Sequence, residues 1–126
     1  LDLVDGLASR EVSADFVARN TAADGVISTK APLTRRGREL GLVAIQRFFL
    51  LDSMALNNIE RHLSGDSSDL IEVLPGLMPK IIRRIAETAG KPIIVGGLIS
   101  DKEDVIGALG AGAVAVSTTN PSVWSM

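Results

Sequence analysis

The sequence predicts an α/β fold, namely a TIM-barrel-like (β/α)₈ architecture from which the first two β/α units are absent. Short runs rich in Val and Ile recur along the chain, segments with helical periodicity separate them, and a glycine pair follows the penultimate run. Successive runs start roughly 18 to 28 residues apart, the length of one strand, one helix and two loops. In a doubly wound dinucleotide-binding sheet the glycine-rich loop follows the first strand, so the late glycine pair favours the barrel.

Six segments are expected to be strands buried on both faces, as in a parallel sheet. They are Leu1–Val4, Gly25–Thr29, Leu42–Gln46, Leu70–Leu74, Pro92–Val95 and Ala113–Val116. Because the first of them starts at Leu1, we expect a further N-terminal segment to precede it. The chain then contains the C-terminal six β/α units of the barrel.

The segment between the fourth and fifth runs shows the clearest helical pattern. Its apolar residues share one face: Leu77, Met78, Ile81, Ile82, Ile85 and Ala89. Its charged residues lie opposite: Lys80, Arg83, Arg84 and Glu87. The pattern predicts an amphipathic helix that covers a sheet.

Helix-boundary signals agree with this division. Asp52 or Ser53 is expected to cap one helix, Ser100 and Glu103 to form the capping box of another, and Pro79 to lie in a first turn. Glycines that follow helices and precede strands are expected to be left-handed C-caps, namely Gly41, Gly90 and Gly112.

Composition limits the classes of function. The 126 residues, 46% of them hydrophobic, fit a single α/β domain over residues 1–126. A net charge of −2 gives no global attraction to nucleic acid, and zero cysteines with one histidine predict neither a metal site nor a cofactor. No apolar run approaches the ~20 residues that span a bilayer, so we expect a cytoplasmic protein with no membrane contact.

The last two predicted strands carry the strongest functional signal. In barrels, the loops after strands seven and eight often hold phosphate with backbone N–H groups. Here these loops carry glycines and hydroxyls, and the predicted phosphate contacts are Gly96, Gly97, Ser117 and Thr118. The structural alternative is that the glycines only form a tight turn and the hydroxyls only cap a helix.

Polar residues near the ends of other strands are candidates to bind a glycerol-like diol or to support its site. They are Asp2, Gln46, Arg47 and Glu72. Glu72 interrupts an apolar strand, and a buried carboxylate needs a partner such as Arg47 or Lys30. An interior layer of salt bridges is an equally weighted alternative.

The densest basic cluster is a candidate contact for phosphate or RNA: Lys30, Arg35, Arg36 and Arg38. The alternative is a solvated helix face near Glu39, which we favour. Phe16 and Phe49 are expected in the core. With 3% aromatic residues and no tyrosine, the sequence shows no platform for stacking single-stranded RNA.

Several longer motifs resemble those of the glycerol uptake operon antiterminator family. They are Asp24–Thr29, Ala44–Ser53, Ile71–Gly76, Met78–Ile82 and Val95–Ile99. The resemblance extends over nearly the whole chain, from the third strand of the family's barrel to its end.

The resemblance implies a bacterial regulator without catalytic activity. It would respond to glycerol 3-phosphate and act on the leader mRNA of glycerol-utilisation genes to prevent premature transcription termination. A phosphosugar-binding barrel enzyme of the isomerase or aldolase type is the alternative, with Glu72 as base or Lys30 as Schiff-base lysine. Six units of an eight-unit barrel would leave two strand edges open, which favours a homo-oligomer.

Overall fold

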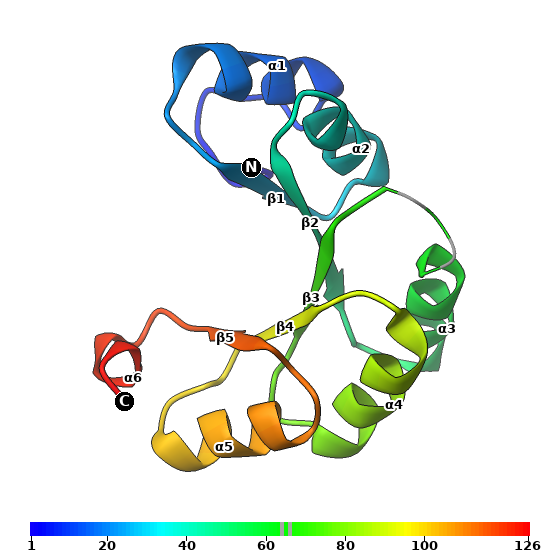
Figure 1. Cartoon of the computed structure of the whole chain (residues 1–126), viewed down its shortest axis with the longest axis vertical. Helices are drawn as coiled ribbons and strands as arrows, with labels where there is room; N and C mark the ends of the chain where they lie inside the picture. Colours follow the sequence, from blue (N-terminus) through cyan, green and yellow to red (C-terminus); the bar gives the residue numbers. More distant parts are fainter. Residues whose placement is uncertain (64, 66) are drawn as a thin grey trace. The chain divides into compact units, whose positions relative to one another are not determined.

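The computed structural model describes residues 1–63, 65 and 67–126 and contains alternating helices and strands (Figure 1). The helices are α1 (Glu11–Asn20), α2 (Ala31–Glu39), α3 (Ser53–His62), α4 (Pro79–Ala89), α5 (Lys102–Gly110) and α6 (Pro121–Trp124). The strands are β1 (Gly25–Ser28), β2 (Val43–Phe49), β3 (Leu70–Leu74), β4 (Ile93–Gly96) and β5 (Ala115–Ser117). The α/β class predicted from the sequence is confirmed.

The strands are hydrogen-bonded in the order β1-β2-β3-β4-β5, which is also their order along the chain. β1 and β2 pair in parallel, with Gly25 opposite Val43 and Ser28 opposite Gln46. β4 and β5 also pair in parallel, with Gly96 opposite Ser117. Parallel neighbours bring their carboxyl ends to the same edge, so the loops that follow β4 and β5 start side by side.

The chain forms two compact units, residues 1–47 with 65–71 and residues 48–64 with 72–126. In the first unit α1 and α2 lie next to each other (Figure 1). Its core consists of the buried residues Ala14, Val17, Val26, Leu33 and Leu42. These apolar residues come from both helices, from β1 and from the segment before β2, and their burial holds the unit together.

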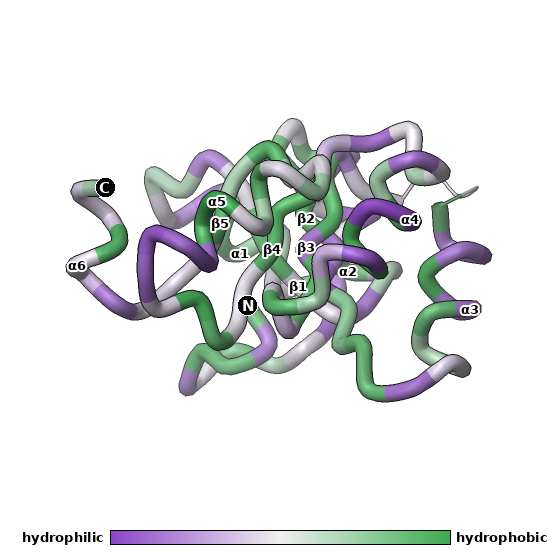
Figure 2. Tube along the Cα trace, turned by 90° about the horizontal axis from the view of Figure 1, so that it is seen from below, coloured by the Kyte–Doolittle hydropathy of each residue, from purple (hydrophilic) through white to green (hydrophobic). Residues whose placement is uncertain are grey.

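In the second unit α4 buries one face, as its periodicity predicts. Ile82 and Ile85 are fully buried and Ala89 nearly so, whereas Arg83 and Arg84 are exposed. Leu77 lies before the helix and is 43% exposed, so it does not belong to the buried stripe. Figure 2 shows the alternation of hydrophobic and hydrophilic residues along α4 and the largely hydrophobic β4.

Most boundary signals are confirmed. The Asp52 carboxylate caps α3 by accepting a hydrogen bond from the N–H of Ala55, and Pro79 is the first residue of α4. Gly90 ends α4 in the left-handed region at φ 62°, and Gly41 and Gly112 also have positive φ.

Four further predictions are wrong. β5 is not buried on both faces, because it is the last strand of the sheet order, and its residues Ala115 and Ser117 are exposed. Residues Leu1–Val4 form turns and not a strand. The N-terminal amine of Leu1 donates to the carbonyl oxygen of Ile27, and the Asp2 carboxylate accepts from the N–H of Thr29, so this segment is held against β1 as a loop. Ser100 and Glu103 form no capping box, since Asp101 is the cap of α5 and its carboxylate accepts from the N–H of Asp104. Phe16 and Phe49 are 50% and 48% exposed and so are not core residues.

Among the described residues, no helix combines the length and the apolar character needed to cross a membrane.

Candidate functional site

The loops after β4 and β5 are joined by side-chain hydrogen bonds. The Thr118 hydroxyl donates to the carbonyl oxygen of Ile99 at 2.8 Å and accepts from the backbone N–H of Asn120 at 3.1 Å. The Asn120 amide nitrogen donates to the carbonyl oxygen of Ser100 at 3.1 Å. These bonds join the Ser-Thr-Thr-Asn turn to Ile99 and Ser100, which follow the glycine pair.

Several backbone donors in these two loops have no acceptor among the residues that the structure describes. Among residues 1–63, 65 and 67–126, the N–H groups of Gly97, Leu98 and Thr119 donate to no protein acceptor. The Ser117 hydroxyl likewise makes no hydrogen bond to any described residue. Unpaired N–H groups that gather on adjacent loops form the kind of concavity that binds anions.

The backbone of the first loop is fixed in a left-handed conformation. Gly97 has φ 78° and Leu98 has φ 63°, and Leu98 is the one non-glycine residue with positive φ among those described. The carbonyl oxygen of Gly97 accepts from the N–H of Gly76 at 3.1 Å, which anchors the loop to the segment after β3. Leu98 is 72% exposed. No pattern in the sequence marks this residue, because leucine rarely adopts such a backbone conformation.

Glu72 is a buried carboxylate beside these loops. It lies on β3 and is 1% exposed. A Cβ added to Gly96 would lie 3.0 Å from Glu72 Oε1 and 3.3 Å from the Cβ of Ser117. Gly96 therefore lets the carboxylate and the second loop approach its backbone closely.

Asp2 and Gln46 form a network in the first unit. The Asp2 carboxylate accepts hydrogen bonds from the Ser28 hydroxyl and from both the N–H and the hydroxyl of Thr29. Burial raises the pKa of the Asp2 carboxyl, but the hydrogen bonds from Ser28 and Thr29 outweigh it and lower the pKa below its usual value. Gln46 accepts from the Thr34 hydroxyl at 2.9 Å and donates to the carbonyl oxygen of Thr29 at 2.7 Å. This network shapes the end of β1.

Arg47 is half-buried on β2. Together with Asp2 and Gln46 it belongs to the first unit, whereas Glu72 and the two loops belong to the second.

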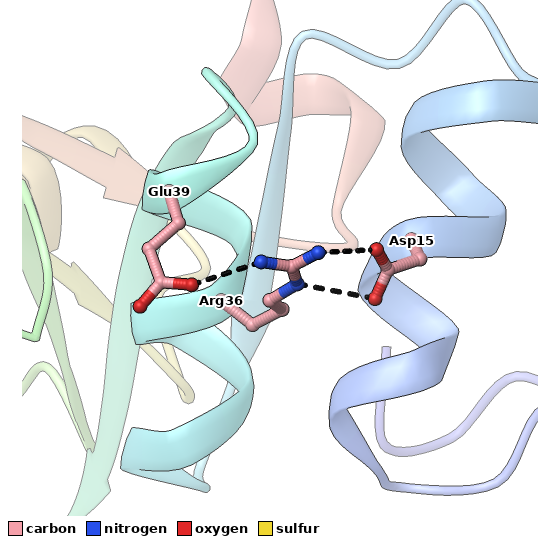
Figure 3. A network of polar contacts seen from close by, with 3 residues as sticks. All are labelled: Asp15, Arg36 and Glu39. Carbon is pink, nitrogen blue, oxygen red and sulfur yellow. Dashed lines mark hydrogen bonds and ion pairs between the residues drawn. The ribbon is translucent and has the colours of Figure 1, made fainter.

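The predicted basic cluster is partly neutralised by carboxylates. Arg36 bonds Asp15 through two nitrogens, at 2.7 and 3.2 Å, and Glu39 through a third contact at 3.0 Å (Figure 3). These contacts lower the pKa of the Asp15 carboxyl, chiefly through the hydrogen bond from Arg36, and raise that of the guanidinium. Arg38 pairs with Asp69 at 3.1 Å. Two of the four cations therefore serve as links within the first unit.

Lys30 and Arg35 are both exposed. Neither makes an ion pair with any residue that the structure describes. Of the four cations, these two retain the most freedom to meet an anion in solution.

The helix N-termini near the two loops are occupied by the protein itself. The Asp104 carboxylate accepts from the N–H and hydroxyl of Ser100, and the resulting hydrogen bonds lower its pKa. The Asn120 side chain caps the four-residue helix α6 by accepting from the N–H of Ser122. The unused donors of this site thus come from the loops and not from a helix end.

Comparison with known proteins identifies the family. The sequence profile described as "Glycerol-3-phosphate responsive antiterminator" matches residues 1–124. The chain belongs to this antiterminator family. An Escherichia coli K12 relative named "Uncharacterized protein YgcP" is 42% identical over all 126 residues, and the chain spans 66% of that relative's length.

Two solved structures of antiterminator proteins resemble this family member. The glycerol uptake operon antiterminator regulatory protein of Listeria monocytogenes is 35% identical, with a TM-score of 0.93 over 98% of this chain and 67% of that chain. An antiterminator-related protein of Thermotoga maritima is 32% identical, with a TM-score of 0.80 over 99% of this chain and 70% of that chain. The family resemblance inferred from the motifs is confirmed.

No group of three or more His, Cys, Asp or Glu residues with metal-binding geometry occurs within the described ranges 1–63, 65 and 67–126. The two loops and the neighbouring strand β3 supply backbone N–H groups, the Ser117 hydroxyl and the buried Glu72 carboxylate.

Proposed function

We propose that the protein is a glycerol 3-phosphate-responsive transcription antiterminator that acts in the cytoplasm on the leader mRNA of glycerol-utilisation genes. Membership of the antiterminator family supports the regulatory, non-enzymatic role. The observation that carries the ligand assignment is the set of unused backbone donors on two adjacent loops, after β4 and after β5.

In this proposal the phosphate binds at the N–H groups of the glycine-pair loop. Gly97 contributes its N–H, and Gly96 contributes space, because a side chain there would meet Glu72 and Ser117. The Ser117 hydroxyl adds a further donor. The Thr118 hydroxyl already donates to Ile99, so Thr118 fixes the two loops in place and does not itself supply a hydroxyl donor. Fixed donors bind a dianion without the cost of ordering them on binding.

The glycerol end would be held or supported by the polar residues near the strand ends. Glu72 is suited to accept a hydrogen bond from a hydroxyl because it is a carboxylate, which only accepts. Asp2 and Gln46 already bond Ser28, Thr29 and Thr34, so we assign them to supporting the loop after β1. Arg47 is proposed as the positively charged residue among the four assigned to the glycerol end or its support.

The RNA response requires a difference in ligand affinity between two states of the protein. Glycerol 3-phosphate can shift the equilibrium toward the RNA-competent state by no more than its difference in binding free energy between the two states. We propose Lys30 and Arg35 as the cations most able to contact RNA phosphate, since Arg36 and Arg38 are held by carboxylates. We further propose that the five β/α units seen here are the C-terminal part of a barrel, one strand fewer than the sequence predicts, and that the chain self-associates.

Calorimetric titration with glycerol 3-phosphate, glycerol and inorganic phosphate tests the ligand assignment. The wild type should show saturable heat with glycerol 3-phosphate, weaker heat with inorganic phosphate and none with glycerol alone. Gly97→Asp places a negative charge at the phosphate and should abolish binding. Gly97→Asn is the matched control, since asparagine has the same shape and tolerates positive φ, and it should retain most of the affinity.

The regulatory part of the proposal is tested by transcription in vitro through a leader terminator of a glycerol-utilisation gene. Read-through should rise with the protein and glycerol 3-phosphate together and stay at its basal level with Gly97→Asp. No saturable binding of glycerol 3-phosphate to the wild type would reject the sensor, and turnover of a triose phosphate would favour an isomerase or aldolase.

A further inference from the structure

Glu72 stands out as a buried carboxylate at the point where β4 turns into the glycine-pair loop. It is 1% exposed, and its neighbours Ile71 and Val73 are also buried. Its Oε1 lies 3.0 Å from the position that a Cβ on Gly96 would occupy, and the Cβ of Ser117 lies 3.3 Å from the same position. The carboxylate is therefore adjacent to the backbone of both loops that carry the unused donors.

A carboxylate in this place imposes a chemical requirement on any ligand. It accepts hydrogen bonds and cannot donate them, and a second acceptor facing it would be repelled. A phosphate bound at the loop N–H groups must therefore point away from Glu72. The ligand atom that faces Glu72 is bound to the carbon next to the phosphate-bearing carbon, and it must carry a hydrogen to donate. In glycerol 3-phosphate the hydroxyl closest to the phosphate is the one on C2.

We infer that Glu72 is a specificity-determining residue that selects phosphorylated alcohols over phosphorylated ketones. This inference rests on the proposed function and extends it. Glu72 accepts a hydrogen bond from the C2 hydroxyl, whereas a C2 carbonyl oxygen would place one acceptor against another. A site built to hydrogen-bond a hydroxyl rejects an analogue without it far more strongly than an apolar pocket rejects a change of size.

Calorimetry with three probes measures this selectivity. Glycerol 3-phosphate has the C2 hydroxyl, 1,3-propanediol phosphate lacks it, and dihydroxyacetone phosphate has a carbonyl in its place. We expect the wild type to bind 1,3-propanediol phosphate about 10-fold more weakly than glycerol 3-phosphate, and dihydroxyacetone phosphate about 100-fold more weakly or worse.

The decisive variant is Glu72→Gln, whose amide can donate to the carbonyl as well as accept. It should reduce the preference for glycerol 3-phosphate over dihydroxyacetone phosphate to less than about 10-fold. Glu60→Gln is the matched control, because Glu60 lies on α3 and its carboxylate pairs with Arg84 at 2.9 Å. That control should keep the wild-type preference.

A thermal melt of each variant accompanies the titrations. If Glu72→Gln does not fold, Glu72→Asp replaces it: the charge is kept but the carboxylate is withdrawn by one methylene. Glu72→Asp should weaken glycerol 3-phosphate by about 10-fold or more and still reject the ketone; unchanged affinity would overturn the inference.

Two further results separate this inference from the proposed function. Equal wild-type affinity for the alcohol and the ketone, or a full preference retained by folded Glu72→Gln, overturns the role of Glu72 and leaves the phosphate site standing. A wild type that binds no glycerol 3-phosphate overturns both.

Discussion

Replacing Gly96 by alanine tests the close packing around the two loops. The new Cβ would lie 3.0 Å from Glu72 Oε1, 3.3 Å from the Cβ of Ser117 and 3.3 Å from the Ser117 carbonyl oxygen. Overpacking of this kind typically costs about 1–3 kcal/mol, and loss of the glycine's freedom in the unfolded chain returns about 0.4–1 kcal/mol. We expect Gly96→Ala to be destabilised by about 1–2 kcal/mol, because Glu72 and a backbone oxygen must both move.

Urea denaturation measures this difference, and Gly107→Ala is its control. Gly107 lies inside α5 with no atom within 4 Å of an added Cβ, so alanine there should stabilise the helix by about 0.5–1 kcal/mol. Gly96→Ala should lower the midpoint without changing the slope, and should also weaken glycerol 3-phosphate. A Gly96→Ala protein as stable as the wild type, with undiminished affinity, would refute the packing described for Glu72.

Three other perturbations give defined outcomes. Thr34→Val leaves the buried Oε1 of Gln46 without its donor, and the free energy of unfolding should fall by about 1–3 kcal/mol in chemical denaturation, whereas no loss would mean that Gln46 finds another donor. The lowered pKa of the Asp15 carboxyl means that its pair with Arg36 stabilises the folded state above the usual carboxyl pKa, and that this contribution disappears as the pH falls through the lowered value. Asp15→Asn should therefore be less stable than the wild type at pH 7 and equal to it in strong acid. A difference in stability that persists in acid would contradict this. Asp52→Ala removes the cap of α3 and should cost about 1 kcal/mol in a thermal melt, with Asp52→Asn close to the wild type.

The elements that the sequence predicts well are those fixed by local chemistry. Five of six predicted strands are present, because runs such as Ile93–Val95 bury apolar side chains between defined breaks. Asp52 and Pro79 mark helix starts for reasons of hydrogen bonding and backbone shape that act within a few residues. The proximity of the two loops follows from the parallel pairing of β4 and β5.

The features that the sequence does not predict depend on distant partners. In the sequence Arg36 belongs to a basic cluster, but in the structure it pairs with Asp15, which lies 21 positions earlier on another helix. Phe16 is apolar yet half-exposed, because α1 directs other residues into the core. Leu1–Val4 has strand composition but forms turns held by Asp2 and the segment after β1. The left-handed Leu98 has no signal of its own, since its conformation is imposed by the folded loop.

Amide NMR during titration with glycerol 3-phosphate observes the very backbone N–H groups that are proposed to hold the phosphate. We expect saturable shifts that are largest for Gly97, Leu98 and Thr119, with smaller shifts on α1 and α2. Shifts confined to the segment of Lys30 and Arg35, or no saturable shift at the glycine pair, would contradict it.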